Sequence, residues 1–209
     1  MPALSLGRVR SVVAVGAHPD DIEIGAGGLL LALPPGSRVH YVLCTGTADR
    51  HAEARSAAAA FLPAAEVSYS LHDLPDGRLP AHWNNVKEIV EGAARAVAAD
   101  LVLAPSRDDR HQDHRVVAEI VPTAFRDALV LQYEIPKWDG DLGRRSLYLP
   151  LTPERARRKA ALLDDCYPSQ KTRDWWDQET FLGLARLRGM ECRSRYAEAF
   201  SCDKATLTG

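Results

Sequence analysis

Cysteine is scarce in this sequence, and its few copies are not paired by spacing. The four cysteines are Cys44, Cys166, Cys192 and Cys202, and no two of them form a Cys-x-x-Cys pair. Such spacing suits neither a zinc ribbon nor a disulfide-rich secreted scaffold. We therefore expect reduced thiols in a cytoplasmic protein.

Long apolar runs are also lacking. A membrane-spanning helix needs about 18 consecutive apolar residues, and no segment of the sequence reaches that length. The apolar stretch at residues 12–17 is too short for the core of a signal peptide and runs directly into charged residues. We expect no membrane partner.

The sequence has no excess of positive charge. Its 26 basic and 28 acidic residues give a formal net charge of -2, whereas a nucleic-acid-binding domain usually carries a basic excess. The one local basic run, at residues 155–159, is typical of a solvated helix face. We expect no nucleic-acid partner. No heptad pattern marks an interface between copies, so a homo-oligomer remains open.

Apolar and helical segments alternate along the 209 residues. A composition of 46% hydrophobic and 26% charged residues is that of an ordinary globular protein, and the length favours one domain over residues 1–209. Short apolar runs predict buried strands at residues 11–17, 38–44, 67–71, 101–105 and 130–135. Helical periodicity predicts helices at residues 22–33, 50–65, 85–99, 116–129, 153–165 and 178–189, with a loop at 138–150. This alternation predicts an α/β fold with a mostly parallel sheet covered by helices on both faces.

Two clusters of metal-binding side chains follow predicted strands. The first is His18-Pro19-Asp20-Asp21, directly after the strand at 11–17. The second is the segment 108–114, Asp-Asp-Arg-His-Gln-Asp-His, after the strand at 101–105. Ligands of an open parallel sheet bind beyond the carboxyl ends of its strands. We therefore expect both clusters on loops at the same edge of the sheet.

These residue types suit a catalytic zinc site. Such a site takes three protein ligands, often two histidines and a carboxylate, and keeps a position for water. His18, Asp21 and His114 can supply that set, which leaves Asp20 beside the metal as a base for the water proton. A surface loop can also hold His111 and His114 without any function, and either aspartate of the first cluster can instead cap a helix.

His111 and Asp113 complete the second cluster. A histidine near the metal can protonate the leaving amine or, while protonated, stabilise the developing oxyanion. A neighbouring carboxylate can hold the tautomer of that histidine and raise its pKa. We therefore assign His111 to the acid or electrophilic role and Asp113 to its support.

The sequence resembles the PIG-L/LmbE-like zinc-dependent N-deacetylases over nearly its whole length. The resemblance is carried by AHPDD (17–21), DIEIGAGGLL (21–30), HQDH (111–114), YEIP (133–136), the SQ pair (169–170) and YAEAF (196–200). It implies a Rossmann-like α/β fold and one zinc ion per chain, held by His18, Asp21 and His114, although iron(II) or another divalent ion remains open. It also implies Asp20 as general base, and His111 as the electrophilic or acid group with Asp113 as its partner.

The resemblance also implies a substrate class. Family members remove acetyl groups from N-acetylated amino sugars, and some cleave other amides, so we expect a small N-acylated amino-sugar substrate. Arg50 and Glu53 form an Arg-x-x-Glu pair similar to one in relatives, and Asp76, in a Pro-Asp-Gly turn, resembles a position that faces the sugar. The pair is equally consistent with an exposed helix start, and Asp76 with a simple turn residue.

Three positions depart from the family pattern. Thr45-Gly46-Thr47 stands where relatives often carry Asn-Gly, Gln112 stands where proline is common, and Asp109 stands where some relatives use a tyrosine. None of these changes removes a predicted ligand or base, so they affect the choice of substrate.

Other functions remain open from the residues alone. Two histidines and a carboxylate also describe non-haem iron oxygenases, but those usually use a double-sheet β-barrel. The chain could also hydrolyse a non-sugar amide, or be a non-catalytic, metal-containing sugar-binding protein, although a free Asp20 argues against a binding role. The glycines at 25, 27 and 28 do not form the Gly-x-Gly-x-x-Gly pattern of dinucleotide sites. The large aromatics either line the substrate or belong to the core: Tyr133, Trp138, Trp175 and Trp176.

Overall fold

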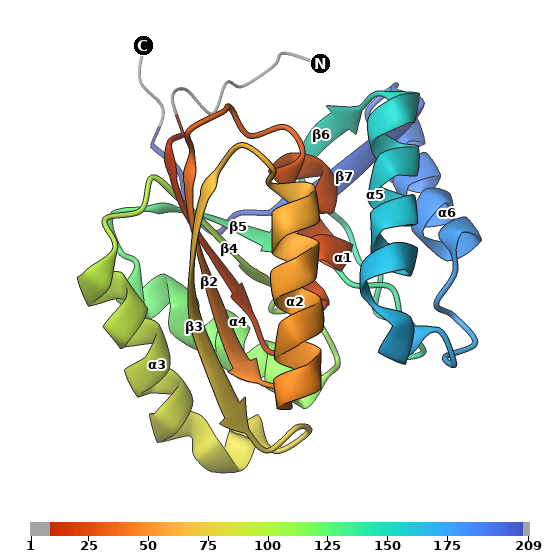
Figure 1. The fold of residues 1–209 in the computed structure, drawn as a ribbon. Coiled ribbons are helices and arrows are strands. Elements are labelled where there is room, and N and C mark those ends of the chain that lie inside the picture. Colours follow the sequence, from red (N-terminus) through yellow and green to blue (C-terminus); the bar gives the residue numbers. More distant parts are fainter. Residues whose placement is uncertain (1–8, 207–209) are drawn as a thin grey trace.

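A seven-stranded sheet forms the centre of the molecule in the computed structural model, which describes residues 9–206 (Figure 1). Its strands lie in the order β3-β2-β1-β4-β5-β7-β6. They are β1 (Ser11–Gly16), β2 (Arg38–Thr45), β3 (Glu66–Leu74), β4 (Leu101–Pro105), β5 (Leu129–Tyr133), β6 (Leu147–Leu151) and β7 (Tyr196–Ser201). The first five strands pair in parallel, whereas β7 runs antiparallel to both β5 and β6. The predicted α/β fold with a mostly parallel sheet is therefore confirmed.

Helices cover both faces of the sheet, as predicted. They are α1 (Asp21–Leu30), α2 (Ala48–Phe61), α3 (Trp83–Ala96), α4 (Gln112–Ala124), α5 (Pro153–Cys166) and α6 (Gln178–Glu191), with short 3-10 turns η1 (Leu79–His82) and η2 (Pro168–Gln170). Alternate residues of β1 face opposite layers. Val12 and Ala14 pack into one apolar core with α1, α2 and α5, while Val13 and Val15 pack into a second core with α3 and α4. No helix in the described range is both long and apolar enough to cross a membrane.

Two further strands correct the sequence prediction. The expected loop at 138–150 ends in β6, and residues 196–201 form β7 between β5 and β6. β6 contains Pro150, which weakens a strand pattern but is tolerated at a sheet edge, where β6 lies. β7 contains Glu198, whose buried carboxylate accepts hydrogen bonds from the N–H groups of Gly28 and Leu29 at 2.6 and 2.8 Å. A charge inside so short a strand hides its apolar pattern.

The helix that carries the second motif also begins earlier than predicted. α4 starts at Gln112 instead of Val116, so the His-Gln-Asp-His motif forms the cap and first turn of a helix instead of a loop. Its N-cap is His111, whose Nδ1 accepts a hydrogen bond from the N–H of Asp113 at 3.3 Å. The first turn is polar, and apolar periodicity therefore reveals the helix only from Val116 onward.

Candidate active site

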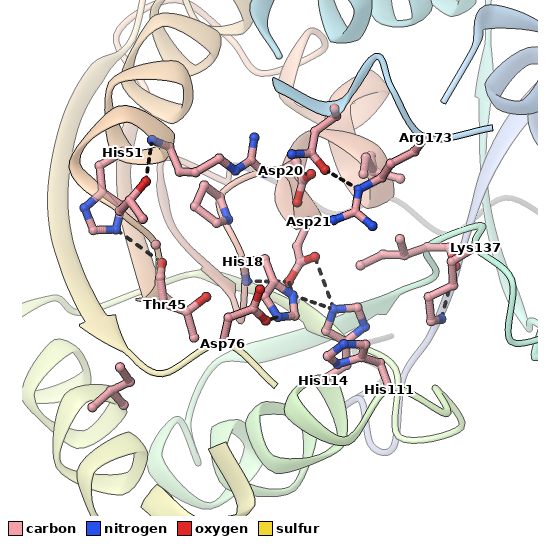
Figure 2. A pocket seen from close by; sticks show the side chains of 18 of the residues that line it. His18, Asp20, Asp21, Thr45, His51, Asp76, His111, His114, Lys137 and Arg173 are labelled. Carbon is pink, nitrogen blue, oxygen red and sulfur yellow. Dashed lines mark hydrogen bonds and ion pairs between the residues drawn. The ribbon is translucent and has the colours of Figure 1, made fainter. Parts of the chain in front are cut away.

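A cavity of about 960 Å³ lies where the segments after the first four strands meet (Figure 2). Seven of the predicted site residues line it: His18, Asp20, Asp21, Arg50, Asp76, His111 and His114. The two remaining predicted residues, Glu53 and Asp113, are not among its lining residues. The cavity therefore collects most of the predicted site from four separate segments of the chain.

The turn after β1 is tight and depends on a glycine. A Cβ on Gly16 would lie 2.9 Å from the carbonyl oxygen of His18 and 3.3 Å from the Cβ of Asp21, so a side chain there would force the turn apart. Asp21 closes the turn, because its Oδ2 accepts a hydrogen bond from the N–H of His18 at 2.9 Å. β1 pairs with β4, and α4 follows β4, which brings His114 to the same place. The prediction that the two motifs meet at one edge of the sheet is confirmed.

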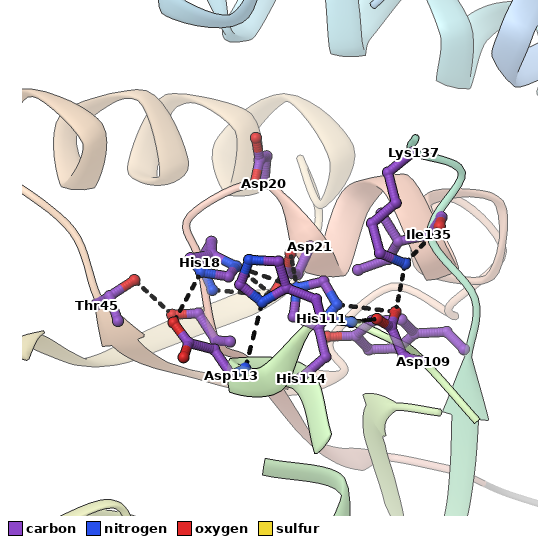
Figure 3. Close-up of polar contacts among 12 residues, drawn as sticks. His18, Asp20, Asp21, Thr45, Asp109, His111, Asp113, His114, Ile135 and Lys137 are labelled. Atoms are coloured by element: carbon purple, nitrogen blue, oxygen red, sulfur yellow. Dashed lines mark hydrogen bonds and ion pairs between the residues drawn. The ribbon is translucent and has the colours of Figure 1, made fainter. Parts of the chain in front are cut away.

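Three side chains form the centre of the cavity (Figure 3). Nδ1 of His18 lies 3.1 Å from Nε2 of His114, which in turn lies 3.2 Å from Oδ1 of Asp21. The same Nδ1 lies 3.5 Å from Oδ2 of Asp21. Ligands of a tetrahedral zinc ion at their usual bond lengths stand roughly 3.3–3.5 Å apart. The donor types and their separations therefore fit a zinc ion.

A second donor set overlaps the first. The ring of His111 lies 4.8 Å from that of His18 and 4.7 Å from that of His114, centroid to centroid. One nitrogen from each of the three rings can be chosen so that all lie within 4.8 Å of one another, close enough to hold a metal. We favour the set with Asp21, because its carboxylate contacts both histidines, one through each oxygen, and because two histidines with one carboxylate are a common catalytic set.

The charges of the cluster support one another. Burial alone would raise the pKa of Asp21, but the charges of His114 and His18 hold it well below its ordinary value. Burial would likewise lower the pKa of His114, but Asp21 and Asp109 raise it to about 9. Asp21 and Asp109 therefore favour the protonated form of His114. Because histidine binds metals in its neutral form, a metal ion bound here would compete with that proton.

Asp20 lies beside the cluster and has a different environment. Its side chain is buried, and Nη2 of Arg50 lies 2.8 Å from its Oδ2. Burial raises the pKa of Asp20 despite the opposing charge of Arg50. The neighbouring carboxyls Asp20 and Asp21 thus have pKa values shifted in opposite directions, which is the usual sign of different chemical roles.

Arg50 and Glu53 make contacts that the sequence did not reveal. Nη1 of Arg50 donates to Oε2 of Glu53 at 2.5 Å and to Oγ of Ser169 at 2.8 Å. Glu53 also accepts hydrogen bonds from the N–H and the hydroxyl of Ser169, at 2.9 and 2.7 Å. The pair therefore links Asp20 to η2. Arg50 lines the cavity, whereas Glu53 does not, and contact of either residue with substrate stays a prediction.

The carboxylate of Asp113 faces His18 instead of His111, which corrects its predicted pairing. Its two oxygens accept hydrogen bonds from the N–H groups of Gly77 and Leu79, at 2.7 and 3.0 Å. Oδ2 also lies 3.3 Å from Nε2 of His18. Side chains two residues apart on a helix point in different directions, so the first turn of α4 sends these two side chains to different partners.

Asp76 reaches the cluster from the turn after β3. Its side chain is 75% exposed, and its Oδ1 lies 3.0 Å from Nε2 of His18. That nitrogen is buried, and its contacts with Asp76 and Asp113 are close in distance but lack good hydrogen-bond geometry among the described residues. Asp76 is therefore an exposed carboxylate that lines the cavity within reach of His18.

Sequence comparison identifies the family. Residues 13–125 match the family model of PIG-L, described as GlcNAc-PI de-N-acetylase. The chain belongs to the PIG-L family. It is similar to the "Uncharacterized deacetylase YaiS" of Escherichia coli (strain K12), with 31% identity over 147 residues that span 63% of this chain and 77% of that protein. The family is one of deacetylases, which are hydrolases.

Solved structures share the PIG-L fold of this chain. GalB, the 4-carboxy-2-hydroxymuconate hydratase from Pseudomonas putida KT2440, has a TM-score of 0.75 at 19% identity and covers 96% of this chain and 98% of its own. The N,N′-diacetylchitobiose deacetylase from Pyrococcus horikoshii has a TM-score of 0.60 at 19% identity and covers 93% and 84%. A hydratase and a deacetylase on one fold mean that the residues of the site, and not the fold, decide the reaction.

Two residues of the site in this PIG-L member escape sequence analysis. Oδ2 of Asp109 lies 2.8 Å from Nδ1 of His114, and Oδ1 accepts a hydrogen bond from the N–H of His111 at 2.8 Å. Nζ of Lys137 lies 2.9 Å from Oδ2 of Asp109 (Figure 3). The same nitrogen lies 2.7 Å from Oδ2 of Asp141. Asp109 fixes the ring of His114 with Nε2 toward the cluster, as carboxylates beside metal-bound histidines do. The position of Asp109 in the second motif could have pointed to this role. Lys137 belongs to no motif and lies beyond residue 125, where the family match ends.

Proposed function

We propose that this protein is a zinc-dependent hydrolase that removes the N-acetyl group from a small amino-sugar substrate. The observation that carries the proposal is the cluster of His18, His114 and Asp21 beside the buried carboxylate of Asp20. The two imidazoles lie 3.1 Å apart, and the two oxygens of Asp21 lie 3.2 Å from His114 and 3.5 Å from His18. Membership in a deacetylase family supports the reaction type. One zinc ion per chain, held by these three residues, would supply a Lewis acid that polarises the amide carbonyl and lowers the pKa of water.

Asp20 is the general base of this proposal. Its burial favours the protonated form, so the carboxylate gains from taking the proton of the attacking water. Arg50 donates to the carboxylate at 2.8 Å, and its charge lowers the pKa of Asp20 against the effect of burial. The proton on Asp20 is then available to the departing nitrogen, which leaves as a free amine while acetate is released.

His111 is the hydrogen-bond donor to the carbonyl oxygen. Its Nδ1 accepts from the N–H of Asp113, so a neutral ring carries its proton on Nε2. Burial lowers the pKa of His111, which favours this neutral form. A neutral donor at this position stabilises the oxygen as negative charge develops on it.

The substrate class rests on the relatives. Similar structures include enzymes named for N,N′-diacetylchitobiose and for the A40926 pseudoaglycone. Arg50 and Asp76 line the cavity and are our candidates for contacts with the sugar. A non-sugar amide, iron(II) in place of zinc, and a non-catalytic sugar-binding role are the alternatives that the experiment must separate.

The test compares zinc-loaded with chelator-treated protein and follows amine release from N-acetylglucosamine and its conjugates. We expect release that requires zinc and that Asp20→Asn abolishes while zinc remains bound. Release that persists without any metal would contradict the metal mechanism. If no conjugate is hydrolysed although zinc is bound, the amino-sugar proposal fails, and other amides or a binding role take its place.

A further inference from the structure

One wall of the cavity is aromatic and belongs to the C-terminal part of the chain. It is formed by Trp138 and Trp175, whose rings are 6.0 Å apart and nearly perpendicular. Trp138 is 63% exposed, the highest exposure among the large hydrophobic side chains that the structure describes. The other exposed large hydrophobics do not line this cavity: Trp83, Leu142, Leu187 and Met190.

The exposed indole of Trp138 is held in place from two sides. Its Nε1 donates to Oδ1 of Asp174 at 2.8 Å, and the guanidinium of Arg173 lies 5.6 Å from its ring centroid. Arg173 is itself fixed by a hydrogen bond from Nε to Oε1 of Gln170 at 2.7 Å. Single exposed hydrophobic residues are common and need no explanation. Trp138, however, lines the cavity and is oriented by two partners, which suits a side chain that contacts a ligand.

The same wall is anchored in the core. Trp175 packs against Trp176 at 5.6 Å, and Trp176 packs against Phe181 and Tyr167 at 5.2 and 5.8 Å. Trp176 and Tyr167 are buried. The aromatic pair at the cavity therefore packs against a buried cluster of rings, which restricts its side chains before a ligand binds and lowers the entropic cost of binding.

We propose that Trp138, Trp175 and Arg173 form a subsite for a second sugar ring, linked to the N-acetylated sugar that the metal cluster processes. This subsite rests on the proposed function for its catalytic consequence. The substrate is accordingly a disaccharide or larger glycan, and a single amino sugar fills only part of the cavity.

The size and chemistry of the cavity favour this occupant. Its volume of about 960 Å³ stands at the upper end of the roughly 300–1,000 Å³ typical of sites for drug-sized ligands. Polar side chains lie beside the indoles in the lining of the cavity, namely Lys137, Asp139, Gln170 and Arg173. A pyranose ring offers apolar C–H groups to an indole face and hydroxyls to such neighbours, whereas an acyl chain offers them no hydrogen-bonding group.

The test uses N,N′-diacetylchitobiose, in which each N-acetylated sugar carries the other as a second ring, so either binding direction presents one. N-acetylglucosamine is the single-ring reference, and phenyl N-acetylglucosaminide carries a flat aromatic ring instead. For zinc-loaded protein we expect kcat/KM to be about tenfold higher for the disaccharide than for the monosaccharide. Trp138→Ala should remove this preference through KM, Trp138→Phe should keep most of it, and Trp83→Ala is the matched control on an exposed tryptophan outside the cavity.

Binding to chelator-treated protein, followed by calorimetry, gives a readout that does not need catalysis. Disaccharide binding that weakens about tenfold in Trp138→Ala, and not in Trp83→Ala, supports the subsite even if no amide is cleaved, in which case only the proposed reaction has failed. Deacetylation with equal kcat/KM for one and two rings in the wild type overturns the subsite and leaves the reaction standing. A stronger dependence on Trp138 for the phenyl glycoside than for the disaccharide overturns the assignment to sugar.

Discussion

The two parts of the chain contribute different things to the cavity. Residues 13–125, which match the PIG-L model, supply every predicted metal ligand and the proposed general base from the segments that follow β1 and β4. The later part, which contains the antiparallel strands β6 and β7, supplies the aromatic wall. It also supplies Lys137, which contacts Asp109, and Ser169, which contacts Arg50. Neither part encloses the cavity alone.

This difference shows how the reaction can be kept while the substrate changes. The parallel edge brings Nε2 of His114 to 3.1 Å from Nδ1 of His18 and 3.2 Å from Oδ1 of Asp21, because the segments that carry these residues follow paired strands. The C-terminal segments reach the cavity from longer connections, which tolerate changes in sequence more easily. Substitutions in the first part should therefore affect metal binding and kcat. Substitutions in the second part should affect substrate affinity, or should affect metal binding only through a metal-binding residue of the first part.

The largest effect is expected from removing a ligand in the first part. Asp21→Ala and His114→Ala should lose zinc and reduce kcat/KM by more than about a thousandfold, since metal catalysis contributes several kcal/mol to the barrier. Zinc content by elemental analysis, measured together with amine release, checks this. His51→Ala is the control, because His51 lines the same cavity but contacts the carbonyl of Thr45 at 3.2 Å instead of the cluster. An active, zinc-free Asp21→Ala protein would exclude the proposed ligand set.

The next largest effect is expected from replacing Asp20, the proposed general base. Asp20→Asn keeps the shape of the side chain but cannot accept a proton, so kcat should fall by about a hundredfold to ten-thousandfold while zinc stays bound. Steady-state kinetics with zinc analysis separate this result from loss of metal. Thr47→Ala, at the N-cap of α2 beside the same cavity, serves as a control that should change kcat little. Near-normal turnover of Asp20→Asn would assign the base elsewhere.

The first part was the more predictable one because its signals are local. The run at 11–17 marks a strand, the turn at 18–21 follows it directly, and parallel pairing brings the second motif to the same edge. Distances within the cluster, however, depend on the pairing of β1 with β4. These strands are far apart in the sequence, so no local pattern predicts their pairing. The direction of the Asp113 carboxylate depended on where α4 begins, and its polar first turn concealed that start.

The second part was less predictable because its contacts are long-range. Ser169 contacts Arg50 across 119 positions of the chain, and Glu198 binds the N–H of Gly28 across 170. Sequence periodicity reports which face of an element is apolar, but not which distant side chain it meets. Tyr133 and Trp176 proved to be core residues, whereas Trp138 and Trp175 line the cavity.

A smaller effect, on zinc affinity, is expected from Asp109, the carboxylate that contacts the proposed metal ligand His114. Asp109→Asn should weaken zinc binding by about ten- to a hundredfold, because it no longer fixes the ring of His114 as a charged acceptor. Competition with a zinc-binding dye measures this affinity. Asp108→Asn is a close control, since its side chain is 71% exposed and lies 3.5 Å from Arg145 instead of the cluster. Equal zinc affinity in the two variants would mean that Asp109 has no part in holding the ligand.

The smallest effect is expected from Lys137, and it tests whether the second part acts on the metal only through the first. Lys137→Met removes the charge 2.9 Å from Oδ2 of Asp109 but leaves that carboxylate on His114. Zinc affinity should therefore fall by less than in Asp109→Asn, and the double variant should be no weaker than Asp109→Asn alone, because residues in one network are not additive. Lys171→Met, at an exposed pair with Asp164, controls for the loss of a positive charge. If the double variant loses zinc affinity by the full sum of both single effects, Lys137 affects the metal site independently of Asp109. The second part of the chain would then act on the metal directly and not only through the first part.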